Sequence, residues 1–156
     1  MAGFEARLAE LGIELPDVAP PVAAYIPAVA TGQYVHTSGQ LPFTAGALPA
    51  TGKVGDGHGL VPAEDAKAYA RTCILNALAA VRAEIGSLDR VARIVKVVGF
   101  VASDPSFTGQ PGVINGASEL LGEVFGDAGR HARSAVGVAV LPLDSPVEVE
   151  LLVEFA

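Results

Sequence analysis

The sequence predicts an α+β protein whose mixed β-sheet carries two main helices on one face. Apolar residues recur at helical spacing in two long segments, whereas five other segments have the alternating or continuous apolar pattern of strands. Hydrophobic residues make up 51% of the chain but aromatic residues only 6%, so small aliphatic side chains must fill the core. The expected helices are 62–86 and 111–125, and the expected strands are 22–30, 34–38, 91–102, 133–141 and 147–155.

The first 20 residues are expected to be an N-terminal extension made of a helix and a connector. Phe4, Leu8 and Leu11 lie at helical spacing within residues 2–11, and Gly12 follows as a stop. The prolines in 16–21 prevent a regular helix or an inner strand in that segment. We therefore expect a short amphipathic helix followed by extended chain.

Two strand-like segments, 22–30 and 34–38, follow with only residues 31–33 between them. A connection of this length with glycine at its centre is typical of a β-hairpin. The next segment, 44–61, is rich in glycine and is expected to form a loop.

Both main helices show recognisable start, stop or periodic signals. Pro62 stands in the first turn of one helix, and Gly86 ends it. Its inner stripe consists of small residues and includes Cys73, so this thiol is expected to lie in the core. In helix 111–125 the pair Asn115-Gly116 is typical of a turn, but the apolar residues around it keep a helical period. We expect the helix to continue, with this pair on its polar face.

The later strands differ in their predicted surroundings. Strand 91–102 is dense in valine and isoleucine, which predicts burial on both faces. Six residues, 141–146, join the last two strands, so these strands need not pair with each other. In strand 147–155, Glu148 and two further glutamates alternate with apolar residues, so one face is core and the other carries carboxylates. That acidic face needs either solvent or another subunit.

Length and charge restrict the class of protein. The 156 residues fit one domain, 1–156. Charged residues make up only 17%, which indicates that part of the surface is buried against other subunits. A net charge of −7 disfavours nucleic acid as a partner, and no apolar segment reaches the roughly 18 residues of a membrane span. With one cysteine and no signal-like start, the expected location is the cytoplasm.

The motifs of common cofactor sites do not fit the chain. Residues 46–54 resemble a phosphate-binding loop, but the spacing is one residue too long and valine replaces the magnesium-binding hydroxyl. His36, His58 and His131 are far apart in the sequence and form no metal-ligand pattern. His131 lies near Ser134, but no nucleophile-elbow sequence surrounds that serine. We expect neither a metal nor an organic cofactor.

Two charged residues have open interpretations. Arg133 stands at the head of an apolar strand, where an arginine either extends to solvent or binds an anion with its planar fork. Glu148 belongs either to a solvated strand face or to a face covered by another subunit. In the covered case its pKa would rise, and it would become a candidate acid or base.

In chain order, these segments resemble the RidA/YjgF family, and the resemblance covers nearly the whole chain from about residue 20. The most specific part is Ala-Arg-Ser at 132–134 with Leu-Pro at 141–142 and Val-Glu-Val-Glu at 147–150. The other carriers are Pro-Val-Ala-Ala-Tyr at 21–25, Tyr-Val-His-Thr-Ser-Gly-Gln-Leu-Pro at 34–42 and Val-Ala-Ser-Asp-Pro-Ser-Phe at 101–107.

The resemblance implies a chorismate-mutase-like fold and a homotrimer whose sheets form a central barrel, with ligand clefts between subunits. Arg133 matches the arginine that binds the ligand carboxylate, and Glu148 matches the glutamate that orients water. Tyr25 matches the tyrosine that lines the cleft. The ligand-binding positions match Ser38, Gly39, Asn115 and the backbone N–H of Ala135.

The implied activity is the hydrolytic deamination of enamines and imines such as 2-aminoacrylate and 2-iminopropionate, without a cofactor. The chain departs from the family pattern in having Ala135 where many members have cysteine, and in the longer 44–61 loop. A second hypothesis is therefore a non-catalytic protein that binds a small carboxylate such as a 2-oxo acid in the same clefts. The ribonuclease role of some relatives is disfavoured by the net charge of −7.

Overall fold

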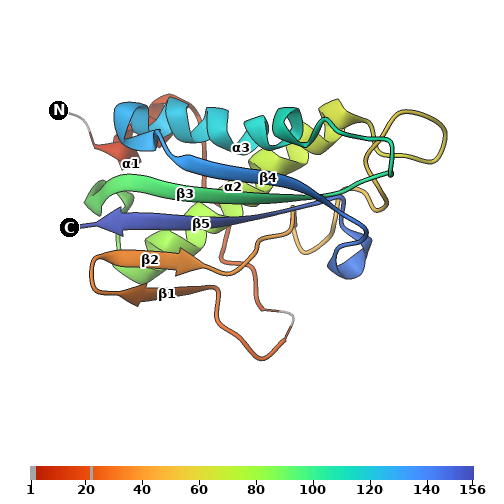
Figure 1. The fold of residues 1–156 in the computed structure, drawn as a ribbon. Helices are drawn as coiled ribbons and strands as arrows, with labels where there is room; N and C mark the ends of the chain where they lie inside the picture. Colours follow the sequence, from red (N-terminus) through yellow and green to blue (C-terminus); the bar gives the residue numbers. More distant parts are fainter. Residues whose placement is uncertain (1–2, 22) are drawn as a thin grey trace.

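A computed structural model describes residues 3–21 and 23–156. Its five-stranded sheet has the order β1-β2-β5-β3-β4 (Figure 1). The helices are α1 (Phe4–Glu10), α2 (Ala63–Ile85) and α3 (Gln110–Phe125), with short 3-10 turns η1 (Leu88–Arg90), η2 (Gly126–Gly129) and η3 (Pro142–Asp144). The strands are β1 (Ala28–Thr31), β2 (Tyr34–Thr37), β3 (Val91–Ala102), β4 (Ala132–Val138) and β5 (Val147–Phe155).

The sheet is mixed, as the sequence predicts. The strands β3 and β4 run parallel, whereas the other neighbouring pairs are antiparallel. The strand β3 lies between β4 and β5 and separates the last two strands. The link 141–146 is long because it must cross the end of β3, and it does so through η3.

The two main helices cover one face of the sheet. The α2 stripe of small residues predicted from the sequence is buried, Cys73 included, and so are Ile114, Leu120 and Leu121 of α3. Figure 1 shows α2 behind the strands and α3 along the side that carries β4. The α+β class and its helices on one sheet face are therefore confirmed. In residues 3–21 and 23–156, no helix is long and apolar enough to cross a membrane.

The two main helices approach each other at backbone level. A Cβ atom on Gly116 would overlap the backbone carbonyl of Lys67 on α2. The prediction that the helix continues through Asn115-Gly116 is confirmed, but Gly116 is buried at the α2–α3 contact and not on a polar face. Glycine stands here because any side chain would force the helices apart.

Three predictions of strand extent or burial were wrong. The strand expected over 22–30 begins only at Ala28, because Pro27 has no N–H to donate to a ladder and bends precede it; Val22 lies outside the described residues. The strand expected over 133–141 ends at Val138, where β3 stops offering a partner. Strand 91–102 is not buried on both faces in this chain, since Val98 and Phe100 are only half-buried.

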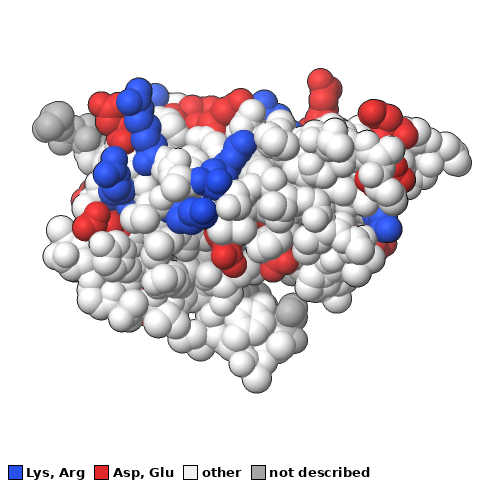
Figure 2. Space-filling model, viewed as in Figure 1, with Lys and Arg blue, Asp and Glu red and all other residues white. Residues whose placement is uncertain are grey.

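We use the term open face for the sheet surface opposite α2 and α3. Its cross-strand rows combine apolar side chains with carboxylates. In Figure 2 much of the visible surface is uncharged, and Lys and Arg lie mostly in the upper left of the view. The rows are His36, Leu152, Lys96 and Ala132; then Glu150, Val98 and Ser134; then Glu148, Phe100 and Val136.

The N-terminal helix is present, as predicted, and is attached to the main helices. The rings of Phe4 and Phe125 pack edge to face with centroids 4.7 Å apart, and Leu8 is buried. The Glu5 carboxylate accepts the backbone N–H of Leu88 at 2.9 Å. The helix runs over Phe4–Glu10, and position 2 of the predicted range 2–11 lies outside the described residues.

Candidate functional site

The predicted site residues form two groups that lie in different parts of the structure. We call the first the Arg133 half-site; it contains the predicted residues Arg133 and Asn115, and also Ser118 and His131, which were not predicted. We call the second the Glu148 half-site; it contains Glu148, Gly39, Ser38 and Tyr25. The first is built by α3, the start of β4 and the residue before it, and the second by the start of β5 and the chain on both sides of the β1–β2 hairpin.

In the Arg133 half-site the guanidinium is turned onto α3. Nη1 donates to Asn115 Oδ1 at 2.7 Å and to Ser118 Oγ at 3.2 Å. Nη2 donates to the Pro111 carbonyl at 3.3 Å. Positions 111, 115 and 118 share one face of a helix, so a single stripe of α3 holds the group.

All three acceptors of Arg133 are neutral oxygens. None of the ion pairs recorded within residues 3–21 and 23–156 includes Arg133. A guanidinium has five N–H donors, and the three recorded bonds leave Nε–H and one Nη2–H. Nε and Nη2 share one edge of the planar fork, which matches the two oxygens of a carboxylate. The group is thus oriented while its positive charge stays available to an anion.

In the Glu148 half-site, a glycine allows the carboxylate to lie against the backbone. A Cβ atom on Gly39 would overlap the Glu148 carboxylate. The N–H of Gly39 makes no recorded bond to an acceptor in the described residues. Burial raises the pKa of the Glu148 carboxyl, and the nearby charge of Glu150 raises it further. A half-buried carboxyl of raised pKa is suited to proton transfer near neutral pH.

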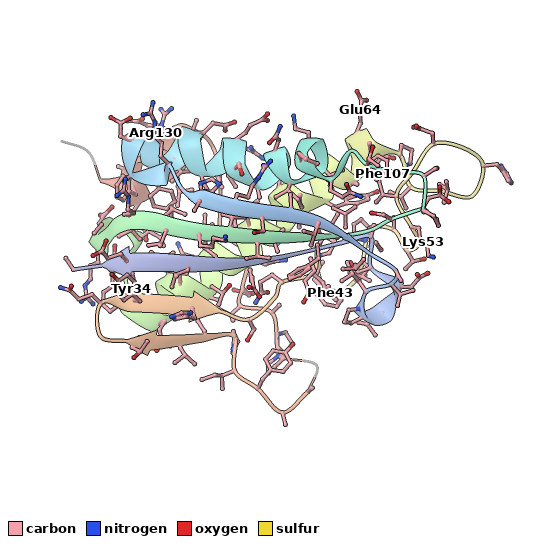
Figure 3. The ribbon with its side chains drawn as sticks, in the orientation of Figure 1. Tyr34, Phe43, Lys53, Glu64, Phe107 and Arg130 are labelled. Atoms are coloured by element: carbon pink, nitrogen blue, oxygen red, sulfur yellow. The ribbon has the colours of Figure 1, made fainter. Side chains whose placement is uncertain are left out.

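Ser38 and Tyr25 shape the same half-site. The Ser38 hydroxyl donates to the Ile26 carbonyl at 2.6 Å, and its N–H donates to the Pro27 carbonyl at 2.8 Å. Ser38 therefore holds the segment that carries Tyr25, and its oxygen can only accept from a ligand. Tyr25 is 41% exposed. With Gly39 and Phe43 it lines a small, mostly apolar hollow, and Figure 3 shows Phe43 near the beginning of β5.

The two half-sites lie on opposite faces of the sheet. Val97 of β3 is directly opposite Arg133, whereas Phe100 is directly opposite Glu148. Positions 97 and 100 are three apart, an odd number, so their side chains project to opposite faces. Ala135 is opposite Gly99 and shares the face of Arg133. One chain therefore does not bring Arg133 and Glu148 onto one ligand.

Sequence reasoning missed Ser118 and His131 as members of the site. His131 was compared with Ser134, yet its ring bonds to Ser118, with Nε2 and Oγ 2.9 Å apart. The available signal was the three-residue spacing of Asn115 and Ser118, which places two polar side chains on one helical stripe. Within the described part of the chain, no three His, Cys, Asp or Glu side chains gather as a metal site requires.

The pKa of Glu148 predicts how stability depends on pH. A carboxyl whose pKa is raised by folding destabilises the native state increasingly as pH rises above its ordinary value of 4.5. Glu148→Gln should therefore gain melting temperature relative to the wild type as the pH is raised from below 4.5 through the raised pKa of the Glu148 carboxyl. Glu154→Gln, a change on the same strand face, is the control. A variant that loses relative stability over this interval would mean that a partner stabilises the Glu148 charge.

The fold and site define the class: a chorismate mutase-like α+β protein with an arginine that is held by neutral oxygens of α3. A family model described as "YjgF/chorismate_mutase-like, putative endoribonuclease" matches residues 5–155. Protein TCP17 of Trypanosoma cruzi is 47% identical over 150 residues, which cover 96% of this chain and 92% of that protein. The chain therefore belongs to the RidA/YjgF family.

Two solved structures extend the comparison. Atu1372 of Agrobacterium tumefaciens is 45% identical, with a TM-score of 0.88 over 98% of this chain and 92% of that chain. E. coli TdcF with bound serine is 27% identical, with a TM-score of 0.66 over 89% of this chain and 94% of that chain. The sheet and helices described above are thus shared with both proteins.

Proposed function

We propose that this protein hydrolyses reactive imines and enamines of the 2-aminoacrylate and 2-iminopropionate type to 2-oxo acids and ammonia. The observation that carries the proposal is the state of Arg133. Its guanidinium is fixed by three neutral oxygens, keeps Nε–H and one Nη2–H for a ligand and has no carboxylate partner in the described residues. A small carboxylate is the anion that best matches these two donors.

The proposed working unit is a homotrimer in which the Arg133 half-site of one subunit meets the Glu148 half-site of the next. Because the half-sites lie on opposite faces of one sheet, a second copy is needed to complete a cleft. The open face supports this assembly, since half-buried Val98 and Phe100 lie there beside Glu148 and Glu150. Covering such a face removes apolar surface from water.

The proposed reaction needs positioning and one proton carrier. Arg133 binds the substrate carboxylate, and Tyr25 and Asn115 line the cleft. Glu148 takes a proton from water as the oxygen attacks the imine carbon and passes it to the nitrogen, which gives a carbinolamine. It then takes the proton of the new hydroxyl as the C=O bond forms and passes it to the departing amine, so that the C–N bond breaks and ammonia leaves. The N–H groups of Gly39 and Ala135 stabilise the developing charge. The imine carbon thus gains a C=O bond and loses nitrogen as ammonia, with no change of oxidation state.

A second candidate function is the binding of a small carboxylate without catalysis. The observation that favours it is the related TdcF, whose structure holds a bound serine. The Arg133 half-site alone would be enough for such binding. The two functions differ in Glu148, because only catalysis requires that its carboxyl exchange a proton.

We further propose one domain over residues 1–156 and a cytoplasmic location. The packing of α1 on α3 through Phe4 and Phe125 supports a common core. The buried free thiol of Cys73 is usual in a reducing compartment.

The direct test measures ammonia release from freshly generated 2-aminoacrylate. We expect the protein to accelerate release above the spontaneous rate and to sediment as three chains at micromolar concentration. Chelator treatment is expected to leave the rate unchanged. No acceleration, together with binding of pyruvate, would favour the second candidate function. A monomer in sedimentation would remove the basis for a site shared between subunits.

A further inference from the structure

The Arg133 half-site contains a second layer that the proposed reaction does not use. His131 lies just before β4, and its ring Nδ1 is 2.6 Å from the carbonyl oxygen of Gly129. Its Nε2 is 2.9 Å from Ser118 Oγ, and that oxygen is 3.2 Å from Arg133 Nη1. These contacts form a continuous chain of hydrogen bonds from the η2 turn to the guanidinium.

The direction of each hydrogen bond follows from its chemistry. A carbonyl oxygen only accepts, so Nδ1 of His131 carries the hydrogen and donates to Gly129. Nε2 of this tautomer is an acceptor, so the Ser118 hydroxyl donates to it. The lone pairs of Ser118 Oγ are then free to accept from Arg133 Nη1. One tautomer of His131 therefore fixes how Ser118 presents its oxygen.

The anchor of this chain is rigid. Gly129 is buried in η2, and a Cβ atom there would overlap the Leu121 carbonyl of α3. The position of the Gly129 carbonyl is thus set by close packing on the same helix that carries Ser118. His131 spans from the turn back to that helix, so the ring is held at both nitrogens.

None of the groups that hold Arg133 in this chain of hydrogen bonds is a carboxylate, which matters for an arginine that binds an anion. A carboxylate in the place of Ser118 would hold the guanidinium more strongly but would cancel its charge and compete with the ligand. Glu119, the residue after Ser118 on α3, is paired with Lys67. Ser118 and His131 therefore orient Arg133 without weakening its attraction for a carboxylate.

We propose that Ser118 and His131 are positioning residues that hold the Arg133 guanidinium with its Nε–Nη2 edge toward the substrate carboxylate. The effect of these residues on kcat/KM rests on the proposed function. The orientation that they give to Arg133 rests on the hydrogen-bond geometry alone. The two parts are tested separately, so that failure of one is distinguishable from failure of the other.

The structural part is tested by the nitrogen-15 chemical shifts of the His131 ring in the folded wild-type protein near neutral pH. The expected result is a ring with hydrogen on Nδ1 and none on Nε2. This measurement does not depend on any enzymatic activity. A ring protonated only on Nε2 would reverse the direction of the Ser118 bond and overturn the proposal.

The kinetic part is tested by Ser118→Ala with Ser118→Thr as its conservative counterpart. Loss of the hydrogen bond from Arg133 to the neutral Ser118 oxygen should lower kcat/KM by about 3- to 10-fold. The change should appear mainly in KM, because the carboxylate is bound before and during the reaction. Ser118→Thr keeps the hydroxyl and should retain most activity. Thr72→Ala, which removes a helix hydroxyl on α2 that bonds Ala68, is the matched control and should behave as wild type.

Two comparisons separate positioning from a general structural defect. On an imine that lacks the carboxylate, Ser118→Ala should have the wild-type rate, and in the Arg133→Lys background it should add little further loss. Equal losses on both substrates, or wild-type kcat/KM in Ser118→Ala, would overturn the proposal. If the wild type releases no ammonia, the proposed function fails, and the same variants are compared by their affinity for pyruvate.

Discussion

Arg133→Lys is expected to lower kcat/KM for carboxylated imines by about 30- to 1000-fold while the chain stays folded. Lysine keeps a positive charge but cannot offer two parallel N–H donors to a carboxylate, and it loses the bonds to Asn115 and the Pro111 carbonyl. The loss corresponds to about 2–4 kcal/mol of transition-state stabilisation. The measurement is ammonia release with and without a carboxylate on the substrate. Near-normal activity in a folded variant would mean that Arg133 does not bind the carboxylate.

Mixed assemblies provide the decisive control for this variant. If each site combines Arg133 of one subunit with Glu148 of another, trimers assembled from equal amounts of Arg133→Lys and Glu148→Gln chains regain intact sites. In random assembly, the subunit that supplies Arg133 is intact there in half of the cases, and the subunit that supplies Glu148 is intact there in half of the cases. One half times one half gives about one quarter of the sites with both residues intact. Activity no higher than that of the separate variants would place both residues in the same chain's site.

Gly39→Ala is expected to lower kcat/KM by about 100-fold, since displacing a reacting group by about 1 Å has effects of this size. The new Cβ atom would overlap the Glu148 carboxylate, so either this carboxylate or the backbone after β2 must move. Gly122→Ala is the matched control, because it lies on α3 with no neighbour near the added Cβ atom. Both variants are compared by ammonia release and by thermal unfolding.

Retained activity in Gly39→Ala would contradict the placement of Glu148 as the proton carrier. The melting temperature shows whether a loss of activity is due to unfolding. Gly39→Ala should remain folded at the assay temperature although its kcat/KM falls about 100-fold.

The fold was predicted well where a single pattern covered a whole element. The helix that starts after Pro62 and ends at Gly86 and the strand that begins at Val147 match their observed bounds closely. The errors occurred where a neighbouring element decides the outcome. The strand expected from residue 22 is short because bends precede Ala28, and the valine-rich central strand lacks a second covering layer within one chain.

The candidate site was predictable only as far as single residues reveal their chemistry. Arg133 and Glu148 were identified as charged groups in apolar strands, but their opposite faces follow from pairing with Val97 and Phe100. Such register is a property of the assembled sheet and is not visible in the order of the residues. Ser118 was missed because one serine in a helix is ordinary until the strand beside it is known.

The close contact of Gly116 with the α2 backbone has a consequence for how this sequence can vary. The carbonyl of Pro111 and the side chains of Asn115 and Ser118 hold the guanidinium from one rigid helix, so any shift of that helix displaces all three together. A larger residue at 116 would push the helix away from Lys67. Substitutions at 115 or 118 can therefore change ligand preference one hydrogen bond at a time. A substitution at 116 would instead displace all three acceptors of Arg133 together, although each acceptor would still be present.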